Sequence, residues 1–271
     1  MLLKFIIPRF LRTPMRFVLF KFKRQLDAEM FQILNYVNDR KLAIDIGANV
    51  GIYSYYFAQK FDQTFSFEPL EDITVELKAY STINKRLKVH NCALSDYNGE
   101  NWIFTPKLNN GFDYGLTSFT ESSDQHKRTK VQVRTLDSFS FTEVSLLKVD
   151  VEGWEYSVLM GAQLTIARCK PVIFIEIEQR HLGERKIDEI FRLIESFGYR
   201  GLFFNKTRFE TLNNFDLEEN QLSYLHNVHS DNYLNNFLFY IKYNKLYRQN
   251  QVSLMFLINI VEKLIPPNWG N

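Results

Sequence analysis

The segment LAIDIGANVG places polar residues and glycines in alternation directly after an apolar run. Asp45 ends a predicted buried strand, and Gly47 and Gly51 let the backbone turn sharply into a helix and approach a ligand closely. The turn lacks the third glycine of a dinucleotide fingerprint, which brings a pyrophosphate onto the helix N-terminus. A carboxylate at Asp45 repels phosphate but attracts an ammonium or a sulfonium. The pattern therefore predicts a site for a nucleoside that carries an amino acid.

A second acid, Glu68, ends the next apolar run, QTFSFEP (63–69). At the end of the second strand of a nucleotide-binding sheet, an acid accepts hydrogen bonds from both ribose hydroxyls, which requires a ligand without a 2′-phosphate. A glutamate before a proline is also a common solvated strand end. Its position after the glycine turn favours the ribose role.

Three ionisable residues, Lys148, Asp150 and Glu152, follow one another at the exit of the apolar strand SLLKVDVEG (145–153). Lys148 and Asp150 are two apart, so their side chains point to the same face of a strand. Charged groups in this place are costly unless they are used. We interpret all three as catalytic residues, with Asp150 as base or acceptor-orienting group and Lys148 as its tuning partner or as a deprotonated base. The alternative is an ion pair that only closes the sheet edge.

The next acidic strand end supplies candidate substrate residues. Glu176 lies near the end of PVIFIEIE (171–178), and His181 follows it. A divalent metal takes oxygen ligands such as Asp150 and Glu176, but no ligand spacing demands a metal and none is predicted. Ordinary strand-end acids are the competing interpretation.

A polar segment, GFDYGLTSF (111–119), supplies two more candidates, Thr117 and Ser118. Its glycines give flexibility, its tyrosine offers a stacking ring, and its hydroxyls offer hydrogen-bond donors. We predict that Thr117 and Ser118 contact the substrate or form a lid over the cofactor. Plain turn residues are the equal alternative.

Strand-type and helix-type patterns alternate through the middle of the chain, which indicates a mainly parallel sheet with helices on both faces. Ligands of such sheets bind at the carboxyl ends of the strands, where the acids above are expected. An antiparallel pair, ENWIFTP and KVQVRTLDS, is predicted around a polar loop. The remaining predicted strands cover 41–47, 63–69, 87–95, 145–153, 171–178, YRGLFFN and FLFYIKYN, and helices are expected at 51–60, in EDITVELKAYSTIN, at 155–166 and at 186–199.

Four motifs, DIGANVG, FEP, NCALSD and LLKVDVEGWE, follow one another in the chain. With them the chain resembles the FkbM-type family of S-adenosylmethionine-dependent methyltransferases over residues 41–178, and FLFYIK matches a final strand. The resemblance implies a class I methyltransferase fold, Rossmann-like, with seven strands of which the last is antiparallel. It also implies S-adenosylmethionine as the cofactor, and a sulfonium cation agrees with the acidic turn.

The resemblance further implies roles for single residues. It surrounds the methionine part of the cofactor with Asp45, Gly47, Asn49 and Gly51. It assigns the ribose to Glu68, and the adenine end to Phe67, Pro69, Ala93 and Leu94, with Ser95 and Asp96 nearby. It also places a segment of small residues and serine over the active site, which agrees with Thr117 and Ser118 as substrate or lid residues.

The N-terminal segment is basic and apolar, with no acid before Asp27. Such a segment suits peripheral contact with an anionic membrane through residues 1–24, and a helical arm packed on the domain is the alternative. It contains no transmembrane run and no convincing signal peptide, so we expect a cytoplasmic protein, with the arm at the inner membrane surface if it binds lipid. The predicted divisions are an arm (1–30), a methyltransferase domain (31–248) and a C-terminal helical appendage (249–271).

Three functions remain open from the sequence. The favoured one is O-methylation of a hydroxyl of a sugar, a surface polysaccharide or a secondary metabolite. A nucleic-acid methyltransferase is disfavoured because 33 basic and 31 acidic residues leave a net charge of only +2. A non-catalytic nucleotide-binding module is the third, and it would gain weight if the C-terminal helix blocked the acceptor cleft. The two cysteines have no short spacing, so neither a disulfide framework nor a zinc site is expected.

Overall fold

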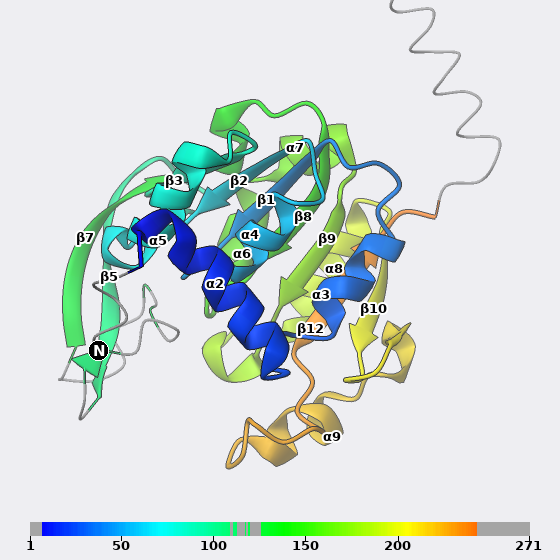
Figure 1. Cartoon of the computed structure of the whole chain (residues 1–271). Helices are drawn as coiled ribbons and strands as arrows, with labels where there is room; N and C mark the ends of the chain where they lie inside the picture. Colours follow the sequence, from blue (N-terminus) through cyan, green and yellow to red (C-terminus); the bar gives the residue numbers. More distant parts are fainter. Residues whose placement is uncertain (1–6, 109–110, 113–116, 118, 120–125, 243–271) are drawn as a thin grey trace, which may run out of the picture. The chain divides into compact units, whose positions relative to one another are not determined.

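A computed structural model describes residues 7–108, 111–112, 117, 119 and 126–242. Within these residues the centre is an eight-stranded sheet in the order β11-β10-β12-β9-β8-β1-β2-β3 (Figure 1). Five adjacent strands run parallel. They are β1 (Leu42–Ile46), β2 (Gln63–Phe67), β3 (Leu87–His90), β8 (Val144–Val149) and β9 (Val172–Glu176). The predicted α/β fold, mainly parallel and Rossmann-like, is confirmed.

The far side of this sheet is antiparallel. β12 (Asn236–Tyr240) lies between β9 and β10 (Arg200–Phe204) and runs antiparallel to both, as predicted for the last strand. The predicted count of seven strands is corrected to eight, because β11 (Phe209–Thr211) returns beside β10 as a short hairpin. The Asn205 side chain accepts hydrogen bonds from the backbone of Thr207 and Arg208 and closes this turn. Three residues are too few to carry an alternating pattern.

The predicted strand 87–95 is divided between two sheets. Its first part is β3, and its end, β4 (Ala93–Leu94), joins a smaller sheet in the order β4-β7-β5-β6. The Asn91 amide causes the break, because it donates to the Glu68 carbonyl and to the Thr74 hydroxyl, both at 2.9 Å. The other strands of the small sheet are β5 (Gly99–Leu108), β6 (Gly111–Phe112) and β7 (His126–Arg134), and β5 and β7 are antiparallel as predicted.

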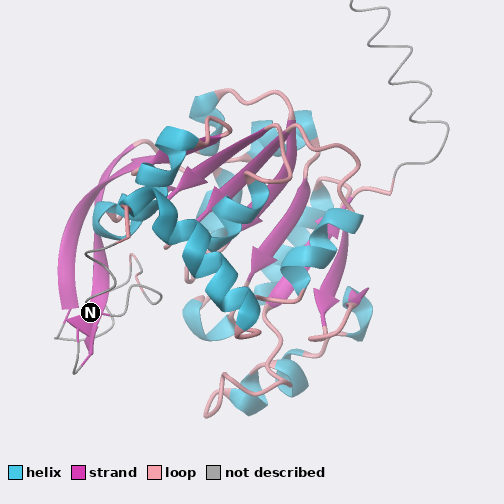
Figure 2. Ribbon diagram, in the orientation of Figure 1, coloured by secondary structure: helices cyan, strands magenta, loops and turns pink. Residues whose placement is uncertain are grey.

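Helices cover both faces of the main sheet (Figure 2). Successive side chains of β12 point to opposite faces, and both faces are apolar. Leu238 joins the core cluster of α3 and α4 on one face. Phe237 contacts Phe191 of α8 on the other, with ring centroids 4.9 Å apart. The longer covering helices are α4 (Ile52–Phe57), α5 (Glu71–Ile83), α6 (Glu155–Met160), α7 (Gln163–Cys169) and α8 (Ile187–Ser196). Short helical pieces are α3 (Glu29–Gln32), α9 (Leu217–Asn220), and the 3-10 turns η1 (Ile33–Asn35), η3 (Leu136–Phe139), η4 (Gln179–His181), η5 (Leu212–Asn214) and η6 (Leu222–Tyr224).

The predicted helix 155–166 is two helices, α6 and α7. At the junction, a Cβ on Gly161 would lie 1.9 Å from the carbonyl oxygen of Ser95, so the chain passes too close to β4 for a continuous helix with side chains. The Asp137 carboxylate then accepts hydrogen bonds from the backbone of Leu164 and Thr165 and starts α7 anew. The break therefore comes from a contact with a distant part of the chain.

The N-terminal arm contains α2 (Arg9–Phe22), which packs against α5 and α4. Arg16 forms an ion pair with Glu76 of α5 at 2.6 Å, and Phe17 stacks near Tyr56 of α4. The arm is thus a packed helix along one face. None of the described helices has the length and apolar content needed to span a bilayer. The predicted appendage, 249–271, lies outside the described residues.

Candidate active site

The turn after β1 is held in a left-handed conformation by its neighbours. Gly47, Asn49 and Gly51 have φ angles of 75°, 48° and 83°. A Cβ on Gly47 would lie 1.7 Å from the carbonyl oxygen of Asp150, so only glycine fits where β1 and β8 leave the sheet side by side. The backbone N–H groups of Gly47 and Ala48 both donate to the carbonyl of Phe67 at 3.0 Å. Two adjacent strands therefore shape this turn.

Asp45 lies beneath the turn with no exposed surface. One carboxylate oxygen accepts a hydrogen bond from Ser54 of α4 at 2.5 Å, and the other is 3.5 Å from Lys148 Nζ. Burial raises the pKa of Asp45, and the Lys148 charge and the Ser54 hydrogen bond oppose that rise. The cation that Asp45 attracts is therefore the ammonium of Lys148. Because β1 directs this side chain toward α4, Asp45 does not line the pocket above it.

Lys148 is buried between two carboxylates and an aromatic ring. Its Nζ lies 3.1 Å from Asp150 Oδ2 and 4.9 Å from the centre of the Tyr53 ring. Burial alone would lower the Lys148 pKa, but the charges of Asp150 and Asp45 outweigh burial and hold that pKa above its ordinary value. Lys148 is therefore a protonated counter-ion, and this geometry argues against its use as a base.

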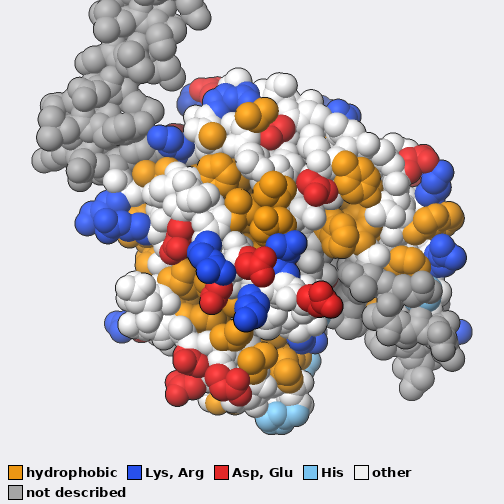
Figure 3. Space-filling model, turned by 180° about the vertical axis from the view of Figure 1, so that it is seen from behind, with side chains coloured by type: hydrophobic (Ala, Val, Ile, Leu, Met, Phe, Trp, Pro, Cys, Tyr) orange, Lys and Arg blue, Asp and Glu red, His pale blue; other side chains and the backbone are white. Residues whose placement is uncertain are grey.

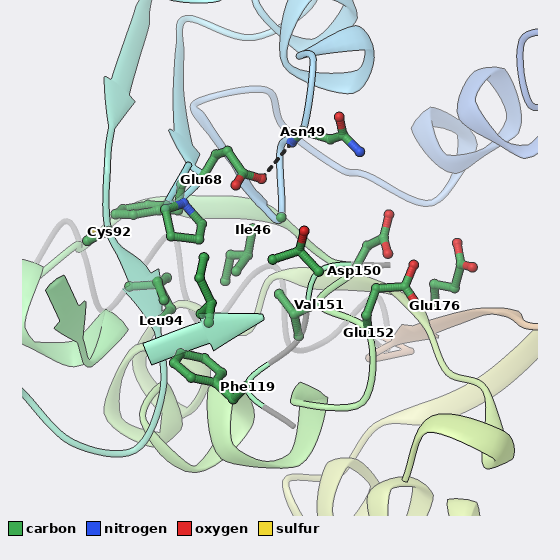
Figure 4. Close-up of a pocket in the computed structure, with 16 residues that line it drawn as sticks. Ile46, Asn49, Glu68, Cys92, Leu94, Phe119, Asp150, Val151, Glu152 and Glu176 are labelled. Atoms are coloured by element: carbon green, nitrogen blue, oxygen red, sulfur yellow. Dashed lines mark hydrogen bonds between the residues drawn. The ribbon is translucent and has the colours of Figure 1, made fainter. Parts of the chain in front are cut away.

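Glu68 forms the wall of the pocket beside the turn (Figure 4). Its two oxygens accept hydrogen bonds from the backbone N–H groups of Asn49 and Leu70, each at 3.0 Å. Burial raises the pKa of Glu68 to about 7, although both hydrogen bonds oppose the rise. A carboxylate oxygen has two lone pairs, so each oxygen can still accept one more hydrogen bond. The side chain is rigidly held with acceptor capacity left for a ligand.

These residues border a pocket of about 820 Å³, counting the part open to solvent, which lies at the carboxyl ends of the central strands. Its two ends differ in chemistry (Figure 4). The apolar end is formed by Phe67, Pro69, Cys92, Leu94, Ile103 and Phe119. The acidic end is formed by Asp150, Glu152 and Glu176. Among the described lining residues there is no lysine and no arginine.

The acidic end begins with a strained loop. Glu152 adopts a φ of 53°, which a non-glycine residue rarely takes. His181 Nδ1 lies 2.7 Å from Glu152 Oε2, and a Cβ on Gly153 would lie 2.3 Å from the His181 carbonyl oxygen. Burial raises the pKa of Glu152, and the hydrogen bond from His181 opposes the rise. The close approach to η4 therefore fixes Glu152 in this conformation and turns its carboxylate to the pocket.

One amide holds Glu176, the third acid of this end, together with Glu178, which does not line the pocket. Asn235 Nδ2 donates to Glu176 at 2.7 Å and to Glu178 at 3.0 Å. Burial, with the charges of Asp150 and Glu152, raises the pKa of Glu176 well above its ordinary value. Burial acts likewise on Glu178, but hydrogen bonds from Arg180 and Tyr233 outweigh it and lower the Glu178 pKa. Glu176 therefore holds a proton more tightly than Glu178 does.

Most of the residues predicted from the sequence meet in this pocket. Those that line it are Gly47, Asn49, Glu68, Pro69, Ala93, Thr117, Asp150, Glu152 and Glu176. Lys148 and His181 lie behind it, each in contact with a lining carboxylate. The Thr117 hydroxyl lies 3.1 Å from that of Thr105. Ser118 lies outside the described residues.

Two further predicted cofactor residues are placed elsewhere. Gly51 packs on α5, where a Cβ would lie 2.5 Å from Leu77 Cδ1, so helix packing explains this glycine. Asp96 is exposed and accepts a hydrogen bond from Ser95 at 3.0 Å. Neither lines the pocket. Gly51 and Asp96 each follow a segment that lines the pocket, and at these two residues the chain has already turned away from the pocket.

Sequence reasoning missed part of the lining, namely Ile46, Cys92, Ile103, Phe119 and Val151. The alternation in ENWIFTP marks Ile103 as an inward residue of its strand. It does not show that Ile103 of β5 lines a pocket at the edge of another sheet. Asn235 and Tyr233, which hold the two glutamates, come from the polar segment before β12, and only the position of β12 beside β9 brings them to the site.

A family model and several solved structures are similar to this chain. The family model described as methyltransferase FkbM domain matches residues 45–200, which include the glycine turn, Glu68 and the Lys148–Asp150 segment. The methyltransferase FkbM of Methylobacillus flagellatus is 18% identical, with 74% of this chain and 44% of that chain covered and a TM-score of 0.47. This chain thus spans less than half of the length of that protein. No curated protein matches the chain.

Two other solved structures are similar in part. An rRNA methylase of Streptococcus thermophilus is 8% identical, with 79% of this chain and 95% of that chain covered and a TM-score of 0.40. A putative methyltransferase of Streptococcus mutans, in complex with SAH, is 8% identical, with 78% and 93% covered and a TM-score of 0.40. The family model covers more than half of the chain. Together with the strand order of the main sheet, it shows a class I methyltransferase fold, and the chain belongs to the FkbM methyltransferase domain family.

Proposed function

We propose that the protein is an S-adenosylmethionine-dependent O-methyltransferase that acts on a hydroxyl of a sugar, a glycan or a secondary metabolite. The observation that carries the proposal is the lining of the pocket. Four carboxylates border it, and the described lining contains no basic side chain. Such a pocket repels phosphate-bearing ligands and tolerates a cationic one.

The pocket residues fit the methyl donor part by part. Glu68 has free acceptor capacity for two ribose hydroxyls, and the apolar end, with Phe67, Leu94 and Phe119, suits the faces of adenine. The turn at Gly47 and Asn49 allows the close approach of a methionine group. When bound, the donor supplies an electrophilic methyl group on a cationic sulfur.

Asp150 is the residue best placed to receive the proton of an acceptor hydroxyl. Its side chain is 32% exposed and lines the pocket, and the Lys148 ammonium at 3.1 Å fixes its orientation. A hydroxyl oxygen is a poor nucleophile until a base removes its proton, so Asp150 acts as general base and Lys148 as its positioning partner.

No metal ligand is assigned, and the described residues contain no group of three or more acids, histidines or cysteines placed to hold a metal ion.

The rest of the acidic end suits a polyhydroxylated acceptor. The raised pKa of Glu176 favours its neutral form, which can donate a hydrogen bond, while a charged carboxylate only accepts. Sugar hydroxyls both donate and accept, so Glu176 beside the carboxylates of Asp150 and Glu152 suits them. A nucleic-acid acceptor is disfavoured by the lining, and the face seen in Figure 3 mixes basic and acidic side chains without a continuous basic patch.

Calorimetric titration with S-adenosylmethionine, and with NAD as a control ligand, tests the donor. We expect micromolar binding of S-adenosylmethionine only, and a sharp loss in Glu68→Ala. Glu71→Ala is the matched control, because Glu71 is an exposed glutamate at the start of α5 with no place in the pocket. Binding of NAD, or no binding of S-adenosylmethionine, would overturn the proposal. Positive binding then justifies a screen of glycan and polyol acceptors for methyl uptake.

A further inference from the structure

Helix α2 carries an apolar stripe on the face that points away from the domain. Leu11, Met15, Val18, Leu19 and Phe22 are all exposed, with Val18 at 62% and Phe22 at 87%. They recur three or four residues apart, so they form one continuous line along the helix. A row of exposed large apolar side chains on one helix is uncommon in a protein surface and marks an interaction site.

The opposite face of α2 is already used for packing. Thr13 is fully buried, Phe17 stacks against Tyr56, and Arg12 and Arg16 pair with Glu76 of α5. These contacts fix the rotation of the helix on the domain. The fold therefore holds the apolar stripe on the outer side of α2. The side that packs on the domain is a different one.

Basic side chains surround the stripe. Arg9, Lys21, Lys23 and Arg24 are exposed at the two ends of α2, and neither α2 nor its flanking turn contains an acid before Asp27. An apolar line flanked by cations, on a helix that lies along a surface, is the arrangement of interfacial membrane helices. A twofold contact between two copies would bring the same cations together, which their repulsion opposes.

We propose that α2 docks the protein on an anionic lipid bilayer. The stripe from Leu11 to Phe22 enters the boundary between headgroups and acyl chains, and Arg9, Lys21, Lys23 and Arg24 contact the headgroups. The connector after α2 leads to Asp27, which accepts a hydrogen bond from the Tyr53 hydroxyl at 3.0 Å. The Tyr53 ring in turn lies against Lys148, so the connector is linked through Tyr53 to the partner of Asp150.

Flotation of the full chain with vesicles tests this docking. One vesicle set contains phosphatidylcholine alone, and the other also contains phosphatidylglycerol. We expect binding to the anionic vesicles only, weakened by salt because the Debye length shortens. Val18→Ser with Phe22→Ser removes apolar burial in the bilayer and lowers the affinity at least tenfold. Leu164→Ser, an exposed leucine of α7, is the matched control and leaves binding unchanged.

A charge variant separates the two parts of the proposal. Lys21→Gln with Lys23→Gln lowers the affinity for anionic vesicles roughly fivefold per lysine. Lys85→Gln with Lys88→Gln, two lysines around the start of β3, is its control and has no effect. Failure of the wild-type chain to float with anionic vesicles would overturn the proposal. Normal flotation of the Val18→Ser, Phe22→Ser variant would also overturn it. The same holds if light scattering shows that the wild type is a dimer and this variant a monomer, because the stripe would then bind a second copy.

Discussion

The two ends of the pocket are built by different physical means. The apolar end gathers side chains from β2, β4, β5 and residue 119, and they act through shape and buried area. At the acidic end each carboxylate has its own partner: Lys148 for Asp150, His181 for Glu152 and Asn235 for Glu176. Binding through buried apolar area tolerates small changes of side-chain shape, whereas a buried charge does not tolerate the loss of its partner. The apolar end should therefore govern donor affinity, and the acidic end both chemistry and stability.

Replacing the proposed base should give the largest effect. We expect Asp150→Asn to lower methyl transfer to a screened acceptor by about 10²–10⁴-fold, because the amide cannot take up the hydroxyl proton. The rate at saturating acceptor should fall while the KM changes little. Asp231→Asn, an exposed aspartate far along the chain, is the control. An Asp150→Asn enzyme with near-normal turnover would move the base to another residue.

Removing the buried cation tests how strongly the acidic end depends on pairing. Lys148→Met leaves Asp45 fully buried without a counter-charge, and we expect a loss of about 3–5 kcal/mol in the free energy of unfolding. Urea denaturation measures this loss. The double variant Asp45→Asn with Lys148→Met should recover much of it, because no fully buried charge is then unpaired. Asp150, the other partner of Lys148, has 32% of its side chain exposed. A single variant that loses less than about 1 kcal/mol would contradict the pairing.

The pH dependence of stability tests Glu68, which stands between the two ends. Its pKa rises on folding from 4.5 to about 7, so the folded chain holds this proton more tightly than the unfolded chain. The contribution of Glu68 to stability is then greatest below pH 4.5 and declines as the pH rises toward 7. Glu68→Gln removes this decline, and its unfolding free energy should gain up to about 3 kcal/mol on the wild type across that range. Parallel pH profiles for the two proteins would show that Glu68 titrates normally.

The smallest effect is expected at the apolar end. Phe119 packs on Trp154 with ring centroids 4.8 Å apart and lines the pocket. Phe119→Ala should weaken the binding of S-adenosylmethionine by about fivefold, which corresponds to about 1 kcal/mol. Trp102→Ala is the control, since Trp102 is an exposed neighbour of Ile103 that does not line the pocket. A Phe119→Ala protein that binds S-adenosylmethionine as tightly as the wild type does would contradict a role of the apolar end in donor affinity.

Local patterns predicted the central elements well. The apolar run into Asp45, the glycine turn and the strand around Lys148 all lie where the sequence placed them, because burial periodicity and glycine conformations act within a few residues. The errors fall where distant contacts intervene. Gly161 against Ser95 divides a helix, and the Asn91 amide divides a strand.

By itself, the sequence determined the strand and turn units, the order of the motifs and the family to which they belong. It also determined that acids gather at strand ends. Only the tertiary structure decided what these acids do, because the strand order places β8 beside β1 and β12 beside β9, and the strands of each pair lie far apart in the chain. That order brings Lys148 to Asp45 and Asn235 to Glu176. Charge pairing is set by distance in space, and spacing along the chain does not encode it.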